Sequence, residues 1–357
     1  MQQVDLLAYT DNFAKTKDIP SLLRQGDPAL CPQPYLSIVI PTYRRAELLK
    51  IALDSALSQA DAGISYEVVV VDNDPPSEGT PSPTENLLRQ YDAPHLLYYR
   101  NQENLGIAGN WNRCGELARG QWVAYLHDDD ILLPDCLQRL GGLIRKKRDI
   151  GGIMALAYEL RDDGNLQQAM GKEAGFLRKV YDRLSPKKLM RLRQIDSLMT
   201  NANPYGAPTC GSVFRRDFLL ASGGFNPEFH PSFDWFFLYR FCSQHKLYRS
   251  MERLGYYRVF VNESLSEKTK EAFFRQRVMF VNYASRSTRL GAFLRRLFAN
   301  EQNHVIINEE YTDFQGKKAE DFFPPAQINP RPVRQRLYPL LTRGYWQAKT
   351  YFNLFFG

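Results

Sequence analysis

The sequence predicts an α/β protein in which helices cover a parallel sheet. From Leu36 onward, short runs of β-branched residues alternate with segments whose apolar residues recur every three or four positions, as strands and amphipathic helices do. One run, Glu67–Val71, is a row of valines, as expected of a strand that is buried on both faces. A chain of 357 residues, 44% of them apolar, is also long enough to bury a large core.

The elements of the first half are predicted in the order strand, helix, strand. The predicted strands are Leu36–Ile40, Glu67–Val71, Leu96–Tyr99 and Trp122–Leu126. The first helix is predicted over about 45–59 because its leucines and alanines form one apolar stripe. A second helix is predicted to end at Gly120, and a third to begin near Pro134, a residue suited to a first helical turn.

The second half is more mixed. A strand is predicted over about 150–160, and beyond Ser266 the chain becomes helical, basic and aromatic. The stretch from Glu271 to Leu297 combines phenylalanines with arginines, and the last 20 residues combine aromatic residues with Arg343 and Lys349. Such a helix can lie on an anionic bilayer, or its aromatic residues can pack on the rest of the protein. The sequence leaves both alternatives open.

The composition says more about the cellular compartment of the protein than about its binding partner. The net charge of +7 suits phosphates, polyanions or an anionic membrane without selecting one of them. Five widely spaced cysteines without a CxxC pair predict neither a disulfide framework nor a zinc site and favour a reducing compartment. The first 20 residues do not have the layout of a signal peptide, and no apolar run approaches the ~20 residues of a spanning helix. We therefore expect a cytoplasmic protein, with any membrane contact peripheral on the inner face.

Polar residues follow all four predicted strands of the first half. The segments at these strand ends are 41–45, 72–74, 100–101 and 127–130. Ligands of open α/β sheets bind at the carboxyl ends of the strands, so the four segments should border one crevice. Three successive carboxylates, Asp128 to Asp130, suit Mg²⁺ or Mn²⁺ and, through the ion, a diphosphate. No GxGxxG or P-loop motif occurs, which argues against a dinucleotide dehydrogenase and a P-loop enzyme.

An ordered set of motifs extends along the chain. It consists of Leu36–Arg45, Val69–Asn73, Asn104–Asn112, Ala118–Gly120, Leu126–Asp130, Gly223–Phe225 and Phe233–Trp235. Together these motifs resemble a family 2 glycosyltransferase of the GT-A fold. The resemblance implies a Rossmann-like mixed sheet with helices on both faces, followed by a helical C-terminal extension.

The resemblance also divides the chain. It covers about 36–266, which would be the GT-A catalytic domain, with a nucleotide half at 36–130 and an acceptor half at 131–266. Residues 1–35 would then be an N-terminal extension, and residues 267–357 the helical, basic and aromatic C-terminal region.

The resemblance assigns the nucleotide site to the strand ends. It implies that the base, ribose and phosphates of the donor are bound by Thr42, Tyr43, Arg45, Asp72, Arg100 and Asp128. Two structural alternatives remain. Asp72 can cap the turn that follows the second strand, and Arg100 can have a structural role, as is common for an arginine after a strand. Arg258 lies where the family has a basic residue that can face the diphosphate.

The same resemblance makes Asp129 the ligand of a Mn²⁺ or Mg²⁺ ion. His127 stands where the family's motif has its first aspartate, and we expect it to have a hydrogen-bonding role rather than to bind the metal. The resemblance makes Asp234 the catalytic base, which takes the proton of an acceptor hydroxyl in an inverting transfer. The alternative is that Asp234 is an N-cap of the helix that begins there.

The function that follows is metal-dependent sugar transfer from a nucleotide donor, UDP-linked by preference, to a hydroxyl of a glycan or lipid-linked glycan. A sugar nucleotidyltransferase is a second possibility, but such an enzyme should have a glycine-rich loop after its first strand, and the segment 41–45 contains no glycine. A basic module that binds membrane or nucleic acid is a third. Because lysines and arginines are spread among acids along the chain, we expect no nucleic-acid partner.

Overall fold

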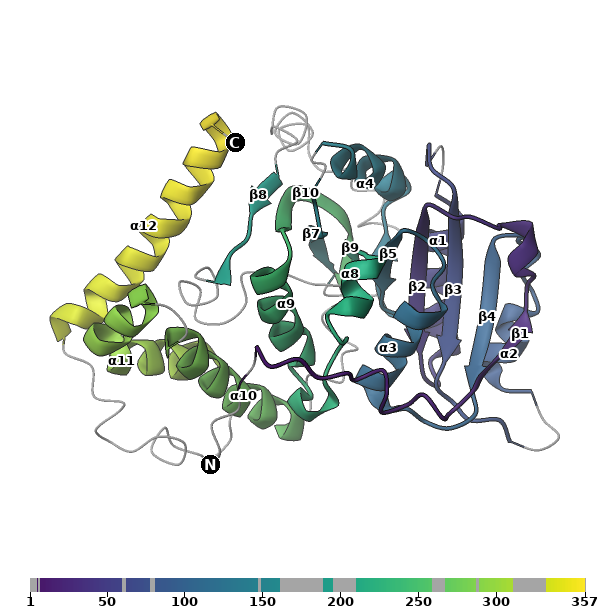
Figure 1. The fold of residues 1–357 in the computed structure, drawn as a ribbon, viewed down its shortest axis with the longest axis horizontal. Helices are drawn as coiled ribbons and strands as arrows, with labels where there is room; N and C mark the ends of the chain where they lie inside the picture. The colour runs from purple at the N-terminus through teal and green to yellow at the C-terminus, as the bar shows by residue number, and fades with distance from the viewer. Residues whose placement is uncertain are drawn as a thin grey trace.

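The computed structural model describes residues 5, 7–59, 62–77, 81–146, 149–160, 189–194, 210–258, 267–286, 289–310 and 332–356. One ten-stranded mixed sheet runs through the molecule (Figure 1). Its strands follow the order β1-β4-β3-β2-β5-β9-β7-β10-β6, with β8 paired to β10. Helices cover both faces of this sheet, so the predicted fold class is confirmed.

Residues 36–130 form the parallel part of the sheet. Its strands are β2 (Leu36–Thr42), β3 (Tyr66–Asp72), β4 (Leu96–Asn101) and β5 (Trp122–Leu126). The helices between them are α1 (Ala46–Leu57), α2 (Pro83–Leu88) and α3 (Gly106–Leu117). Helices α1 and α2 pack on one face and α3 packs on the other. Side chains of β2 and β3 are buried on both faces, which explains their unbroken apolar runs.

The described residues from 131 to 258 add antiparallel pairings. Strand β9 (Cys210–Arg215) lies antiparallel between β5 and β7 (Gly152–Leu160), and β10 (Leu247–Arg258) runs parallel to β7. Short strands β6 (Ile131–Leu132) and β8 (Leu189–Arg191) pair with β10. The helices here are α4 (Cys136–Ile144), α8 (Arg216–Ala221) and α9 (Phe233–Gln244), with 3₁₀ turns η1 (Pro28–Leu30) and η3 (Pro227–Phe229) elsewhere in the chain.

The C-terminal region is helical, as predicted. It consists of α10 (Glu267–Arg286), α11 (Arg289–Glu310) and α12 (Pro332–Phe356). Phe274 and Phe280 of α10 are fully buried and form a cluster with Phe236 and Tyr239 of α9. For these aromatic residues the packing alternative is confirmed, because they face the catalytic domain and not solvent.

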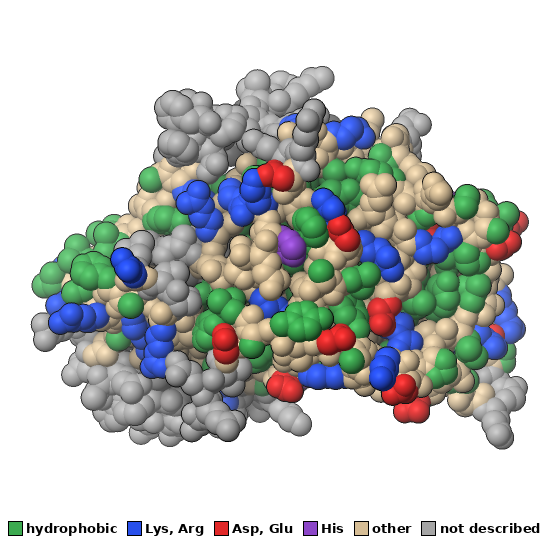
Figure 2. Space-filling view, viewed as in Figure 1, with side chains coloured by type: hydrophobic (Ala, Val, Ile, Leu, Met, Phe, Trp, Pro, Cys, Tyr) green, Lys and Arg blue, Asp and Glu red, His purple; other side chains and the backbone are tan. Residues whose placement is uncertain are grey.

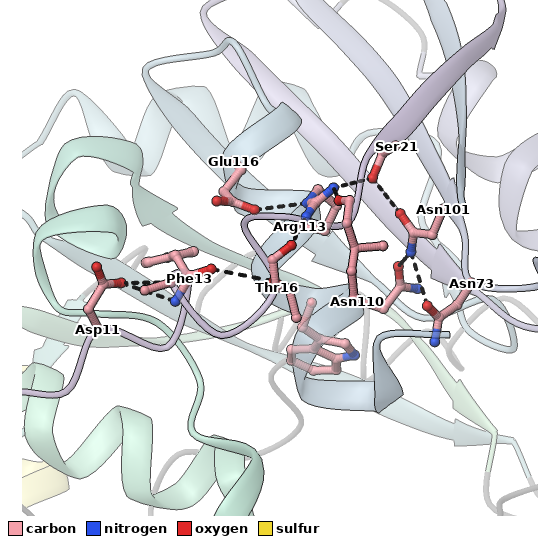
Figure 3. A network of polar contacts seen from close by, with 12 residues as sticks. Asp11, Phe13, Thr16, Ser21, Asn73, Asn101, Asn110, Arg113 and Glu116 are labelled. Carbon is pink, nitrogen blue, oxygen red and sulfur yellow. Dashed lines mark hydrogen bonds and ion pairs between the residues drawn. The ribbon is translucent and has the colours of Figure 1, made fainter. Parts of the chain in front are cut away.

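The N-terminal extension is part of the same sheet. Its strand β1 (Ser21–Gln25) pairs antiparallel with the edge strand β4. The preceding chain crosses α3, where the Arg113 guanidinium donates to Ile19 O at 2.8 Å, to Thr16 O at 2.8 Å and to the Ser21 hydroxyl (Figure 3). Asn12 then bonds to Gly223, which follows α8. The segment thus connects the parallel and the antiparallel parts of the structure.

One glycine makes this connection possible. Gly223 has a φ of +79°, and a Cβ built on it would lie 2.1 Å from Thr10 O. Its carbonyl accepts from Asn12 N at 3.0 Å and from Asn12 Nδ2 at 2.9 Å. A side chain here would therefore both strain the backbone and displace the N-terminal segment.

Replacing Gly223 with alanine is expected to lower the free energy of unfolding by about 3 kcal/mol, measured by urea denaturation. The matched control is Gly142→Ala in α4, where a Cβ would meet nothing within 4 Å. That change should be neutral or stabilise by up to about 1 kcal/mol. Equal effects at both positions would contradict the proposed fit of Gly223.

Candidate active site

The four strand ends lie side by side, as predicted. In the parallel register Thr42 is opposite Asp72, and Asp72 is opposite Arg100. Strand β5 pairs with the other side of β2 and ends immediately before His127. The carboxyl edge of the sheet therefore presents the segments after β2, β3, β4 and β5 in one row, where α/β sheets bind ligands.

The carboxylate Asp128 is bonded to the end of β2. The Thr42 hydroxyl donates to Asp128 Oδ2 at 2.8 Å, and the Arg45 guanidinium lies 3.6 Å from Asp128 Oδ1. Burial, reinforced by the neighbouring charge of Asp129, raises the pKa of Asp128 to about 7. The predicted nucleotide residues Thr42, Arg45 and Asp128 are thus brought together by the structure.

The predicted metal ligand belongs to a cluster of possible ligands. His127, Asp129 and Asp130 each offer one ligand atom, and these atoms lie within 4.8 Å of one another. His127 Nδ1 is 3.9 Å from Asp129 Oδ1 and 3.8 Å from Asp130 Oδ2, too far for hydrogen bonds. The His127 ring packs edge-to-face with Trp111, with the ring centroids 5.0 Å apart. The donor set fits Mn²⁺ or Mg²⁺.

Arg45 occupies the edge of this cluster. Its guanidinium donates to Asp129 Oδ2 at 3.1 Å, and its side chain stays 30% exposed. Asp129 is 3% exposed and Asp130 is fully buried. Asp130 Oδ1 accepts from the backbone N–H of Arg258 at 3.2 Å, which ties the motif to the end of β10. Arg258, the predicted diphosphate residue, is itself buried.

At the end of β3, Asp72 caps the turn that follows. Its Oδ1 accepts from the Asp74 N–H at 3.0 Å, and its Oδ2 accepts from the Tyr98 hydroxyl at 3.0 Å. Burial raises the pKa of Asp72 to about 6. The turn-cap alternative is therefore present in the structure, and contact of Asp72 with a base stays a prediction. The sequence analysis missed Tyr98, whose position two residues before Arg100 places it in register with Val70 of β3.

Tyr43 is the exposed aromatic residue of the nucleotide edge. Its ring is 40% exposed, and the Arg44 guanidinium lies 5.1 Å from the ring centroid. Arg44 has a φ of 55° and donates to Asp74 Oδ1 at 2.7 Å. A left-handed conformation is costly for arginine and is often found at functional sites. It turns the chain so that Tyr43 faces outward beside Asp74.

Arg100 is directed differently from the prediction. Its guanidinium donates to Asp74 O at 2.8 Å, to Pro75 O at 3.0 Å and to Glu85 Oε2 at 3.3 Å. The residue is 3% exposed. Because three acceptors of the protein use these donors, the geometry favours a structural role for Arg100 in holding the loop after β3. Direct contact with a nucleotide stays a prediction that no contact in the structure supports.

The predicted base, Asp234, is the second residue of α9. The N-cap position belongs to Ser232, which makes no side-chain capping bond, so the alternative that Asp234 is the N-cap is wrong. Asp234 is half-buried, and burial raises its pKa to about 7. A carboxyl group with a pKa near neutrality is suited to act as a general base at physiological pH.

A glutamine from the C-terminal region holds the chain before Asp234. Gln276 of α10 accepts from Ser232 N at 2.9 Å and donates to His230 O. The two bonds lie on either side of Pro231, three residues before the carboxylate. Helix α10 therefore belongs to the supporting structure of the candidate site.

Trp111 contacts a sequence neighbour of each of the two predicted groups, the metal ligand and the base. Its ring centroid is 5.0 Å from that of His127, next to the carboxylate motif, and 5.2 Å from that of Phe233, next to Asp234. The neighbouring Asn112 exchanges two 2.8 Å bonds with the backbone of Phe225. The motifs Asn104–Asn112 and Gly223–Phe225 thus lie together, and they place the start of α9 beside the end of β5.

A network of asparagines supports the nucleotide edge from behind, and the sequence analysis missed it. Asn101 Nδ2 donates to Asn73 Oδ1 at 3.0 Å and to Asn110 Oδ1 at 2.9 Å, while the Ser21 hydroxyl donates to Asn101 Oδ1 (Figure 3). Asn73 Oδ1 also accepts from Leu105 N at 2.9 Å. Buried and fully bonded amides of this kind fix loops. Their sequence signal is an asparagine after each of two successive strands.

The fold and this arrangement define a GT-A glycosyltransferase. Comparison with known proteins agrees: residues 37–220 match the family Glycosyl transferase family 2. Because the match covers more than half of the chain, the protein belongs to this family of glycosyltransferases.

Solved structures share the fold at low sequence identity. The structure of S. aureus TarS 1–349 in complex with UDP-GlcNAc is 18% identical with a TM-score of 0.55, over 88% of this chain and 87% of that one. The mannosyltransferase PcManGT from Pyrobaculum calidifontis, in complex with GDP-Man and Mn²⁺, is 16% identical with a TM-score of 0.51, over 96% and 92%.

Curated relatives match over shorter stretches. An uncharacterized protein of Mycobacterium tuberculosis is 34% identical over 57% of this chain and 60% of its own length. A Campylobacter jejuni protein named GalNAc(5)-diNAcBac-PP-undecaprenol beta-1,3-glucosyltransferase is 35% identical over 30% of this chain and 33% of its own length. The matched stretches therefore span less than two thirds of these relatives.

None of the helices in the described residues combines the length and apolarity needed to cross a bilayer.

Proposed function

We propose that this protein transfers a sugar, with inversion and with a divalent cation, from a nucleotide-sugar donor to a hydroxyl of a glycan or lipid-linked glycan. The observation that carries the proposal is the packing around Trp111: its ring contacts His127 of the His and carboxylate cluster at the end of β5 and also Phe233, the residue before Asp234, whose pKa is about 7. A leaving-group site and a base are the two groups that inverting transfer needs.

The nucleotide would bind along the ends of β2 and β3. The exposed face of Tyr43 offers a surface on which a base can stack, and Asp128 lies near enough to Thr42 to orient a ribose hydroxyl beside it. A UDP-linked donor is our preferred assignment. The solved TarS complex with UDP-GlcNAc supports it by fold alone.

Asp129, with His127 and Asp130, would hold Mn²⁺ or Mg²⁺. When bound, such an ion stabilises the negative charge of the departing nucleoside diphosphate. Arg45 already contacts Asp129 and the neighbouring Asp128, and as a partly exposed cation beside the cluster it is placed to reach a phosphate. The solved complex of PcManGT with Mn²⁺ supports a metal site in this fold.

Asp234 would activate the acceptor. Its ionised carboxylate takes the proton of the acceptor hydroxyl while the oxygen of that hydroxyl forms a bond to the anomeric carbon. The bond from this carbon to the diphosphate oxygen breaks on the opposite face, so the configuration inverts and a nucleoside diphosphate leaves. The name of the C. jejuni relative, which acts on an undecaprenol-linked glycan, supports a lipid-linked acceptor.

The test is a thermal-shift panel of UDP- and GDP-sugars with Mn²⁺ or Mg²⁺, followed by product analysis with the ligand that responds. We expect UDP-sugars to raise Tm when the cation is present, because a ligand that binds only the folded state stabilises it by about 2.7 kcal/mol at 100 times its Kd. Turnover should release nucleoside diphosphate. Release of pyrophosphate would instead identify a nucleotidyltransferase, and no response to any nucleotide would refute the donor site.

A further inference from the structure

One face of helix α12 exposes large apolar side chains. Val333, Leu337, Leu340 and Leu341 are 70%, 46%, 62% and 47% exposed. Leu337, Leu340 and Leu341 follow Val333 by four, seven and eight residues, so the four side chains form a single stripe along the helix. Isolated exposed leucines are common on proteins, but a row of them on one helix marks an interaction surface.

An adjacent face of α12 is packed against α11. Tyr338 is 3% exposed, and its ring lies 5.5 Å from that of Phe298 in α11. Arg334 donates to Leu297 O at 2.7 Å. The helix is therefore docked on α11 by one side, and the apolar stripe is the side that this packing leaves outward.

The charged residues of α12 all have one sign. Helix α12 contains three arginines and one lysine and no aspartate or glutamate. Arg336 and Arg343 are exposed and flank the stripe on the side away from Arg334. Figure 2 shows hydrophobic and basic side chains side by side at the end of the molecule that α11 and α12 form. Phe293 of α11 is 57% exposed there as well.

We propose that α12 docks on an anionic lipid bilayer, with Leu337, Leu340 and Leu341 in the headgroup boundary and Arg336 and Arg343 on the acidic headgroups. An apolar stripe beside basic residues is what an interfacial helix needs. Binding to a peptide or to a second copy of the chain would not require a docking helix that lacks aspartate and glutamate. Docking would bring the candidate site to a lipid-linked acceptor, and only this role of docking rests on the proposed function.

The experiment is flotation of the full-length protein with vesicles, without any donor. We expect binding to vesicles of phosphatidylcholine with phosphatidylglycerol and little binding to phosphatidylcholine alone. Leu337→Glu/Leu340→Glu should weaken binding about 100-fold or more, because two buried leucines are lost. Arg336→Gln/Arg343→Gln should weaken it by about tenfold and reduce its dependence on salt.

The matched control is Leu22→Glu/Leu30→Glu, which adds the same two charges at the β1 end of the sheet, where these leucines are 44% and 62% exposed. It should bind vesicles as the unmodified protein does. Equal binding by the Leu337→Glu/Leu340→Glu variant would overturn the proposal. The proposal would also be overturned if the unmodified protein bound no vesicles and formed a dimer in solution that the Leu337→Glu/Leu340→Glu variant dissociates. Release of nucleoside diphosphate from the donor on transfer to a soluble acceptor is measured separately, so a failure of docking is distinguishable from a failure of transfer.

Discussion

Replacing Asp129 with asparagine is expected to reduce sugar transfer by about 1,000-fold, because a metal contributes several kcal/mol to the stabilisation of a leaving group. Asp129 is 3% exposed, and its Oδ1 lies 3.9 Å from His127 Nδ1. The amide keeps the size of the side chain and removes the charge that would hold the ion. Direct Mn²⁺ titration, by calorimetry or by the electron paramagnetic resonance signal of free Mn²⁺, should show loss of binding.

The control for this change is Asp217→Asn in α8, in which the same atoms are exchanged at a carboxylate that is 57% exposed and paired with Arg215 at the end of β9. Its metal affinity and turnover should match those of the unmodified protein. If Asp129→Asn bound Mn²⁺ with unchanged affinity, the cluster would not be the metal site. Full turnover in the presence of a chelator would remove the metal from the mechanism.

Substitution of His127 tests the metal site in a second way. An imidazole ligand favours Mn²⁺ over Mg²⁺, which prefers an all-oxygen shell. His127→Ala should therefore weaken Mn²⁺ binding more than Mg²⁺ binding. Equal loss for both ions would restore the hydrogen-bonding role that the sequence analysis assigned to His127.

The strand ends were predictable because their rule is general. Parallel strands bring their carboxyl ends to one edge, so the positions of Thr42, Asp72 and Asp128 followed from four apolar runs. The direction of a long side chain was not predictable in the same way. Arg100 follows a strand as expected, but its orientation depends on two carbonyls and on Glu85, 15 residues away in sequence.

The termini were harder to predict for a different reason. Strand β1 is largely exposed, so it has no strong apolar pattern, and its pairing with β4 depends on residues about 80 positions away. In α10, the same mixture of phenylalanine and arginine fits packing or membrane binding. Phe274 and Phe280 are buried because α9 packs against them, whereas the apolar stripe of α12 is exposed.

Replacing Asp234 with asparagine is expected to lower kcat by about 1,000-fold, since a positioned general base contributes roughly 10²–10⁴-fold. Donor and Mn²⁺ binding should be unchanged, because Asp234 lies on α9 and not in the cluster at the end of β5. Glu228→Gln is the matched control: it makes the same exchange of carboxylate for amide in η3, where the side chain is 74% exposed. It should keep full activity.

The pH dependence separates a base from a merely structural carboxylate. Burial raises the pKa of Asp234 to about 7, and the base acts only when ionised. At saturating Mn²⁺, kcat/KM should therefore fall about tenfold per pH unit below 7 and level off above 7. Asp234→Asn should lose this limb, whereas Asp234→Glu should keep it at lower activity. If the limb persisted in Asp234→Asn, the proton would be taken by another group, and Asp234 would not be the base.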